Sequence, residues 1–317
     1  MKKLSAFTAL GCLGLMTACG GSAQEPQPDS PVSISVAETA GIPSAFLEYG
    51  VQEGYFEDEG LEVSVDTSTG GAAAVPALVS GDIQFAGSNS VSALLAMGQG
   101  LPVSIVAPGT FGSETPEEDF SAVFVSSDSD ITRPADLDGS TVAVNTLENI
   151  GDLTISEVID ADGGDSSSVE FVEIGFPDML PALDRGQVDA AWLIEPFVTM
   201  GLEDENEPVL WPYVDSYPGL MVGSFLTTNQ YAEENAEVVE AFQDALANTA
   251  AAVAEDDGAF RDALPELSQV SEEAAEAMVL PEWRADVDLE ALAFLEERMR
   301  ERGSLEEPLD ISEIVVE

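Results

Sequence analysis

The segment Gly186–Phe197 reads GQVDAAWLIEPF. Within it, Val188–Trp192 is a short apolar run, which predicts a buried strand. Pro196 fits the first turn of a helix, where the backbone N–H that proline lacks would have no partner in any case. Glu195 therefore lies where a strand gives way to a helix. Its carboxylate could cap that helix or accept a hydrogen bond from a ligand amine.

Similar apolar runs recur on both sides of this segment and alternate with stretches of helical periodicity. Besides Val188–Trp192, the predicted strands are Val32–Val36, Leu61–Val65, Ile83–Ala86, Val103–Ala107, Ala122–Val125, Thr141–Val144, Val169–Glu173 and Leu220–Thr227. The predicted helices are Ala45–Glu53, Ala72–Ser80, Val91–Gln99, Asp152–Asp162, Pro177–Asp184 and Asp288–Arg302. Strands that alternate with helices predict an α/β fold with parallel strands.

The N-terminus has the features of an export signal. A basic Met-Lys-Lys start precedes the apolar stretch Leu4–Met16, which is shorter than the roughly 20 residues that cross a bilayer. Residues 16–20 (MTACG) resemble a bacterial lipobox, although Met16 replaces the usual Leu, Val or Ile. We expect a signal peptide over residues 1–18 and a lipid on Cys19. The alternative is an ordinary signal peptide with an incidental cysteine.

A flexible tether is predicted after the lipid. Residues 19–31 are rich in Gly, Ser, Pro, Gln and acids, a composition that buries little surface. The body that follows is long enough for two lobes or one large domain. Cys19 is the one cysteine left after cleavage, so no disulfide within the chain is expected. We expect a monomer anchored to the cell membrane, facing the periplasm or the cell exterior.

The composition is strongly acidic, with 61 Asp and Glu residues against 9 Lys and Arg, no His and a formal net charge of −52. Lys2 and Lys3 leave with the signal peptide, so the mature chain keeps seven arginines and its charge falls by two units to −54. Scattered acids indicate solubility in a salty medium, where 1 M salt shortens the Debye length to ~3 Å. Nucleic acid and anionic membrane surfaces are therefore not expected as partners.

The missing residue types also exclude most enzyme chemistry. Without His there is no Ser-His or Cys-His nucleophile, and without Lys in the mature chain there is no Schiff-base cofactor. The sequence contains no glycine-rich phosphate loop and no Cys/His metal cluster. The acidic pair Asp128 and Asp130 lacks the glycine and closing glutamate of a calcium loop. We expect no catalytic residues, no cofactor and no metal.

Four segments carry a resemblance to a known family. They are Gly54–Leu61 (GYFEDEGL), Gly71–Gly87 (GAAAVPALVSGDIQFAG), Asp136–Val144 (DLDGSTVAV) and Gly186–Phe197. In this order and spacing they resemble the type II periplasmic binding proteins, in the branch that serves sulfonates, nitrate and thiamine-pyrimidine precursors. The resemblance spans roughly Val32–Met299.

The resemblance implies a two-lobed α/β fold with a hinge and a ligand cleft between the lobes. The first lobe would combine residues 32–120 and 221–317, and the second would be residues 121–220. It also implies that the protein captures a small molecule and delivers it to the permease and ATPase subunits of an ABC importer. Such a protein is not an enzyme.

Ligands of open α/β sheets bind beyond the carboxyl ends of the strands, and residues in those positions can be read from the sequence. Several are Gly, Ser, Thr or Asn at helix starts, which offer backbone N–H groups and short donors. Each could instead serve a turn, a helix cap or the core. The candidates are Thr39, Ile42, Thr69, Gly70, Gly71, Ala72, Ser88 and Asn89 in the first lobe, and Asn145, Thr146, Asn149, Gly151, Phe176 and Glu195 in the second.

The distribution of charge bears on the ligand class. None of the seven arginines falls in the candidate loops, and Arg298, Arg300 and Arg302 lie at the end of the last predicted helix, where cations favour the macrodipole. A carboxylate at Glu195 would repel an anion. We therefore favour an amine-bearing or neutral heterocycle, such as a pyrimidine precursor stacked on Phe176, over a sulfonate or nitrate-like anion.

Two other functions remain open at this stage. A ligand-sensing receptor lipoprotein would have the same fold and would signal to a membrane partner. A pyrimidine-synthase-like enzyme shares the lobe pattern, but it needs an active-site Lys and His, which the mature sequence lacks.

Overall fold

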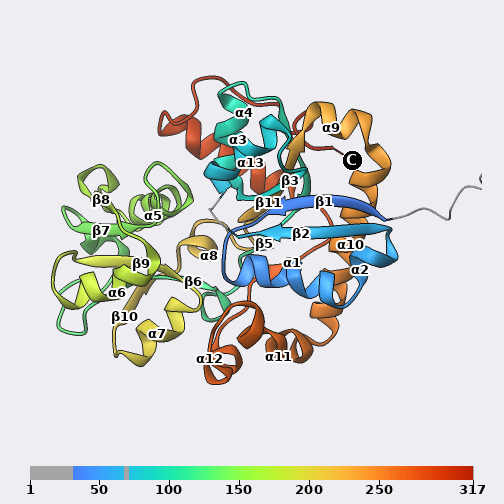
Figure 1. The fold of residues 1–317 in the computed structure, drawn as a ribbon. Helices are drawn as coiled ribbons and strands as arrows, with labels where there is room; N and C mark the ends of the chain where they lie inside the picture. Colours follow the sequence, from blue (N-terminus) through green and yellow to red (C-terminus); the bar gives the residue numbers. More distant parts are fainter. Residues whose placement is uncertain (1–30, 68–70, 317) are drawn as a thin grey trace, which may run out of the picture. The chain divides into compact units, whose positions relative to one another are not determined.

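Two five-stranded sheets organise the computed structural model, which describes residues 31–67 and 71–316 (Figure 1). The first sheet has the order β2 (Leu61–Asp66), β1 (Val32–Ala37), β3 (Phe85–Asn89), β11 (Gly223–Thr228) and β4 (Val103–Pro108). The second has the order β10 (Glu207–Leu210), β6 (Ser121–Val125), β9 (Ala190–Ile194), β7 (Thr141–Val144) and β8 (Glu170–Glu173). A small third sheet joins β12 (Glu282–Trp283) to β5 (Thr110–Phe111).

Helices cover both faces of the two large sheets. Around the first sheet lie α1 (Ile42–Gln52), α2 (Tyr55–Asp58), α3 (Gly71–Ser80), α4 (Ser90–Gly98), α9 (Asn229–Glu234), α10 (Ala236–Glu255), α11 (Asp257–Leu267), α12 (Glu272–Ala277) and α13 (Leu289–Glu301). Around the second lie α5 (Ile150–Ala161), α6 (Phe176–Asp184), α7 (Phe197–Glu203) and α8 (Pro212–Ser216). None of the helices within the described ranges combines the length and hydrophobicity needed to cross a bilayer.

Alternating side chains divide the core of the first sheet between its two faces. Val36 and Phe85 pack toward α1 and α10, where the rings of Phe85 and Phe242 stack at 4.0 Å. Ala37 and Ala86 face the opposite way, toward α3 and α4. In the second sheet Ala143 packs toward α6 and α7, whereas its neighbours Val142 and Val144 pack toward α5. Each sheet is thus buried on both faces, as the unbroken apolar runs require.

Two chain segments connect the sheets and lie side by side. The backbone N–H of Gly109 donates to Gly223 at 2.8 Å, and that of Gly112 donates to Leu220 at 2.8 Å. A Cβ on Gly109 would lie 2.8 Å from the carbonyl carbon of Gly223, closer than real Cβ contacts come. Two glycines are therefore needed for the segments to approach each other here.

The predicted order of elements is confirmed, but the strands are not all parallel as predicted: β11 runs antiparallel to β3 and β4, and β6 runs antiparallel to β9 and β10. Other differences lie at the ends of elements. Ile83–Ala86 and Val188–Trp192 are each displaced two or three residues toward the C-terminus, as β3 and β9. The edge strand β10 and the short β5 and β12 were not predicted, because they lack apolar runs of strand length. The limits of the two lobes stay a prediction, and the signal peptide, Cys19 and the tether up to residue 30 lie outside the described residues.

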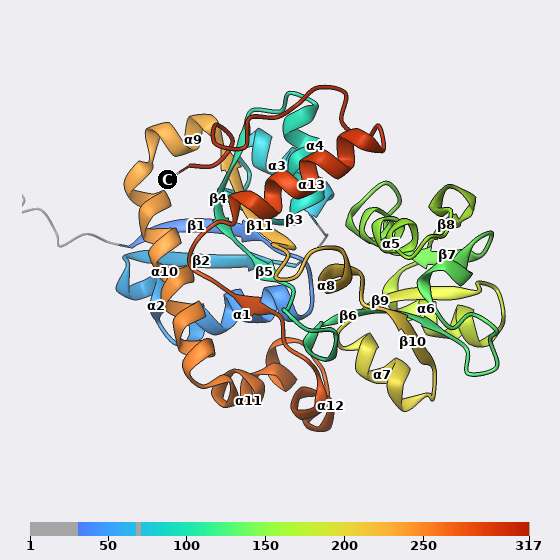
Figure 2. The ribbon, with the colours of Figure 1, turned by 180° about the vertical axis from the view of Figure 1, so that it is seen from behind.

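Arginines at the end of α13 do more than complement the helix dipole. The Arg302 guanidinium lies 2.7 Å from Glu157 and 2.7 Å from Asp160, both on α5. Arg298 lies 3.6 Å from the same Glu157. Because α13 also packs against α4 (Figure 2), these ion pairs tie the first sheet's helices to the second sheet.

We expect Arg302→Gln to lower the free energy of unfolding by ~1 kcal/mol in dilute buffer, because two partly exposed ion pairs are lost. The loss should shrink near 1 M salt, where the Debye length is ~3 Å. Chemical denaturation at both salt concentrations measures it. Arg300→Gln is the matched control, since the one ion pair of Arg300 among the described residues is with Glu296 of its own helix, at 3.8 Å. Equal losses in the two variants would contradict a role for the α13–α5 ion pairs.

Candidate functional site

A cavity of about 530 Å³ lies between the two large sheets, within the size range of small-molecule sites. It is lined by residues that follow β1, β3, β4, β7 and β8, by the end of β9 and by the first residues of the antiparallel strand β11. The carboxyl ends of the parallel strands of both sheets therefore open onto one space, which is where open α/β sheets bind ligands.

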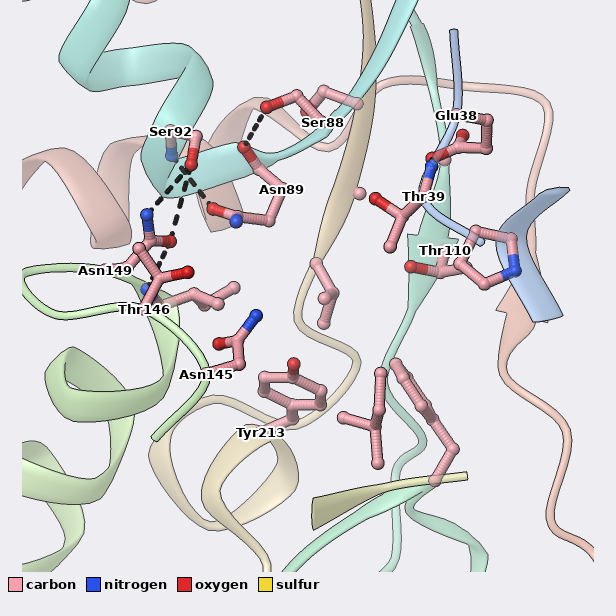
Figure 3. Close-up of a pocket in the computed structure, with 18 of the residues that line it drawn as sticks. Glu38, Thr39, Ser88, Asn89, Ser92, Thr110, Asn145, Thr146, Asn149 and Tyr213 are labelled. Atoms are coloured by element: carbon pink, nitrogen blue, oxygen red, sulfur yellow. Dashed lines mark hydrogen bonds between the residues drawn. The ribbon is translucent and has the colours of Figure 1, made fainter. Parts of the chain in front are cut away.

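Half of the predicted site residues line this cavity, from both sheets. The predicted residues that do so are Thr39, Ser88, Asn89, Asn145, Thr146, Asn149 and Phe176. Figure 3 shows Asn89, the last residue of β3, and Ser92, in the first turn of α4, facing Asn149, Thr146 and Asn145 on the loop before α5.

Two helix N-termini meet at the polar end of the cavity. Asn89 caps α4 by accepting from the Ser92 N–H at 2.9 Å. Asn149 caps α5 in a capping box with Asp152, and its Nδ2 donates to the Ser92 hydroxyl at 3.0 Å. The two caps thereby join α4 to α5 across the sheets, and both helices direct backbone N–H groups toward the cavity.

Neighbouring side chains on the β7–α5 loop are available to a ligand. Asn145 and Thr146 are half-buried and line the cavity. Within residues 31–67 and 71–316, neither side chain has a hydrogen-bond partner. An amide and a hydroxyl can both donate and accept hydrogen bonds. This loop can therefore bind a donor or an acceptor group of a ligand.

Aromatic rings form the remaining walls. Phe46 and Trp283 stack at 4.4 Å with 5° between their planes. From the second sheet, Phe176 packs edge-on to Trp192 at 5.6 Å, and Trp192 packs edge-on to Tyr213 at 6.1 Å. All five rings line the cavity, so the site can enclose a flat, partly apolar ring. Phe176 lines it as predicted, and the other four were not among the predicted site residues.

Two described residues near helix starts, Ile42 and Gly151, were predicted for the site but are not among the residues that line the cavity. Ile42 opens α1 and its side chain is 3% exposed in the core beside that helix. Gly151 lies in the first turn of α5 behind the Trp192 ring. Gly71 and Ala72 begin α3, and their place in the site stays a prediction. The predicted Thr69 and Gly70 lie outside the described residues.

Glu195 lies outside the lining as well, and its carboxylate is occupied by the protein. One oxygen accepts from the Thr199 N–H at 3.0 Å, and the other accepts from the Thr199 hydroxyl at 2.9 Å and from the Val279 N–H at 3.0 Å. Burial raises the pKa of Glu195, and these hydrogen bonds partly oppose that effect. Of the two roles left open by the sequence, the geometry is that of a cap for α7.

Glu38 is a cavity residue that the sequence analysis did not select. It follows β1 directly, is 6% exposed, and accepts from the Thr39 N–H at 2.6 Å. Burial raises the pKa of Glu38 to about 7, and hydrogen bonds from Thr39 act in the opposite direction. Its position immediately after an apolar strand was the signal that could have identified Glu38 as a site residue, as it identified Thr39.

Among the described residues that line the cavity there is no cationic side chain, and Glu38 is the one acid. Over the described part of the chain, no three His, Cys, Asp or Glu side chains gather as a metal site would require. The cavity therefore combines aromatic walls, amide and hydroxyl groups, and a single carboxylate.

The family model described as NMT1/THI5 like matches residues 44–259, more than half of the chain. The chain belongs to the NMT1/THI5-like family. A formylaminopyrimidine-binding protein from Halalkalibacterium halodurans is 26% identical over 200 residues, which cover 62% of this chain. The match spans 58% of the length of that curated relative.

The fold of this NMT1/THI5-like chain is similar to those of solved structures. The alkanesulfonate-binding protein SsuA from Xanthomonas axonopodis pv. citri, bound to MOPS, superposes with a TM-score of 0.75 at 16% identity, over 90% of this chain and 99% of that one. The periplasmic nitrate-binding protein NrtA from Synechocystis PCC 6803 has a TM-score of 0.73 at 14% identity, over 90% and 86% of the two chains. The expected two-lobed fold of the type II periplasmic binding proteins is thus confirmed.

We expect Gly151→Ala to destabilise this NMT1/THI5-like protein, although alanine favours helices over glycine. The new Cβ would lie 2.5 Å from Cε3 and Cζ3 of the buried Trp192 ring, which must move. Overpacking of this kind typically costs about 1–3 kcal/mol, measured by denaturation followed by tryptophan fluorescence. Gly175→Ala is the control, since its Cβ would meet only Pro177, at 4.0 Å. An unchanged Gly151→Ala protein would show that the ring has room.

Proposed function

We propose that this protein is the extracellular substrate-binding lipoprotein of an ABC importer, and that its cargo is a small amine-bearing heterocycle such as a pyrimidine precursor. The cavity between the two sheets carries this proposal, because residues from both sheets line it. Closing the lobes over a ligand would bury it on both sides, as in hinge-closing binding proteins.

The ligand class is supported by the chemistry of the lining. Phe176, Trp192 and Tyr213 can pack against a flat ring, and Asn145 can bond to its polar edge. The described part of the lining includes Glu38 and no Lys or Arg. The relative that is 26% identical bears the name formylaminopyrimidine-binding protein, which agrees with this chemistry.

A sulfonate or nitrate-like anion is the second candidate. The N-termini of α4 and α5 direct N–H groups at the cavity, and helix N-termini favour anions. The similar folds named above are those of an alkanesulfonate-binding and a nitrate-binding protein. Without an arginine clamp and with Glu38 in the lining, an anion is the weaker match.

The connecting segments at Gly109 and Gly223 are the proposed hinge. Backbone hydrogen bonds join the two segments to each other at this point, and small changes in backbone angles there would turn one lobe against the other. A sensor lipoprotein would use the same motion. Permease and ATPase genes beside this one would favour import, and their absence would favour a sensor.

A thermal-shift screen tests the cargo. We expect an aminopyrimidine to raise the melting temperature, since ligand at 100 times Kd adds about 2.7 kcal/mol of stability. Ethanesulfonate, nitrate and amino acids complete the panel. Asn145→Ala should reduce the shift, whereas Asn248→Ala, on the exposed side of α10, should leave it unchanged. A shift with anions alone would replace the heterocycle by the second candidate.

Fractionation of the producing cells tests the anchor. We expect Cys19→Ser to move the protein from the membrane fraction to the soluble or secreted fraction, because the acylated thiol is lost. Cys12→Ser, which changes the other cysteine within the predicted signal peptide, should leave it on the membrane. Membrane retention of the Cys19→Ser protein would show that the lipid assignment is wrong.

A further inference from the structure

We propose that Glu38 selects the ligand by pairing its carboxyl group with an amidine-like edge, formed by a ring nitrogen and an adjacent exocyclic amine. The inference rests on the proposed function, because it assigns a recognition group within the same cavity. It would make this cavity a site for amino-substituted nitrogen heterocycles and a poor site for anions.

The fold makes room for this carboxylate. A Cβ on Gly87, in the middle of β3, would lie 2.0 Å from Glu38 Oε2 and 2.5 Å from Oε1. The carboxylate thus occupies the space above a glycine of the neighbouring strand, and any side chain there would displace it. Thr39, at the end of β1, holds one oxygen through its N–H at 2.6 Å.

The protein leaves the charge of this group unpaired. In the part of the chain that the structure describes, Glu38 forms no ion pair, and no Lys or Arg lines the cavity. Tyr213 is the other titratable lining residue, and burial, followed by the charge of Asp119, raises the pKa of its phenol well above the usual value. Burying a carboxylate that lacks a partner costs free energy. A ligand that supplies the partner removes this cost and therefore binds more tightly.

Two other buried carboxylates show the contrast. Asp119 accepts from the Val214 N–H at 2.8 Å and the Ser121 N–H at 3.1 Å. Glu195 accepts from Thr199 and Val279. Neither lines the cavity, and both use their oxygens to accept hydrogen bonds from the protein, Asp119 from β6 and α8 and Glu195 from α7 and the segment before β12. Glu38 alone among the three combines burial, a single backbone donor and a position on the cavity wall.

The chemistry of an amidine-like edge complements these properties. Its amine donates to one carboxyl oxygen, and its ring nitrogen shares one proton with the other oxygen, so the pair forms two parallel hydrogen bonds. The proton can reside on either partner without leaving an unpaired charge. Nitrate and sulfonate have no N–H to donate, so the ionised carboxylate would repel them.

The position of Glu38 also sets the orientation of a ligand. Figure 3 shows Glu38 and Thr39 on the opposite side of the cavity from Asn149 and Thr146. Glu38 follows a strand of the first sheet, and Asn149 and Thr146 follow a strand of the second. A ring held by Glu38 at one edge can therefore present its other substituents to the β7–α5 loop.

Binding of 4-aminopyrimidine and 4-methylpyrimidine, which replaces the amine by a methyl group of similar size, tests the proposal. Titration calorimetry on the mature protein should show wild type preferring the amine at least tenfold. Glu38→Gln should abolish that preference by weakening amine binding. Glu195→Gln, which alters a buried carboxylate outside the lining, should keep the preference. An unchanged preference in Glu38→Gln would overturn the role of Glu38 and leave the proposed cargo intact.

Measuring the free energy of unfolding against pH shows whether Glu38→Gln is folded. Because the folded-state pKa of Glu38 is raised from 4.5 to about 7, its contribution to stability falls as pH rises through this window. The free energy of unfolding of Glu38→Gln should therefore rise relative to that of wild type between pH 5 and pH 8. Glu38→Asp, which keeps the charge but withdraws it by one methylene, should also lose the preference for the amine. If wild type binds ethanesulfonate and not 4-aminopyrimidine, both the ligand class and the Glu38 assignment are overturned.

Discussion

The close approach of two backbones at Gly109 and Gly223 is the constraint on which the rest of the structure depends. Side chains at these positions would separate the connecting segments, because a Cβ on Gly109 would lie 2.8 Å from the Gly223 backbone. The hydrogen bonds between the segments place the start of β11 beside the end of β4. Residues at the carboxyl ends of β1 and β3 line the cavity on one side, and residues of the second sheet line it on the other.

The chain has many acidic and few cationic side chains, so the position of each cation matters. The sequence contains seven arginines, and two of them, Arg298 and Arg302, form the ion pairs between α13 and α5. Among the described residues no arginine lines the cavity, so the charge of the lining suits the proposed base better than an anion. The acidic surface and the acidic cavity agree in sign, and a positively charged or amine-bearing solute would be attracted by both.

Much of the fold was predictable because its signals are local. Each apolar run from Val32 to Thr227 marks a strand, and Gly54–Leu61 and Gly186–Phe197 carry the family resemblance that the family match over residues 44–259 bears out. Seven of the predicted site residues line the cavity, because positions after parallel strands must lie at one edge of a sheet. The aromatic walls were missed, because Phe46 and Trp283 are far apart in sequence and stack only after β12 pairs with β5.

Glu38 and Glu195 show what each level of structure determined. Both follow apolar strands, so the sequence by itself placed both at strand ends. Because the sequence contains no His, it also excluded an imidazole from the site. Only the tertiary structure distinguished them. Val279, 84 residues further along the chain, donates to Glu195 and completes its hydrogen bonds, whereas Glu38 receives the N–H of its own neighbour Thr39 and faces the cavity. A partner so distant in sequence is set by the folded arrangement, and no local pattern contains it.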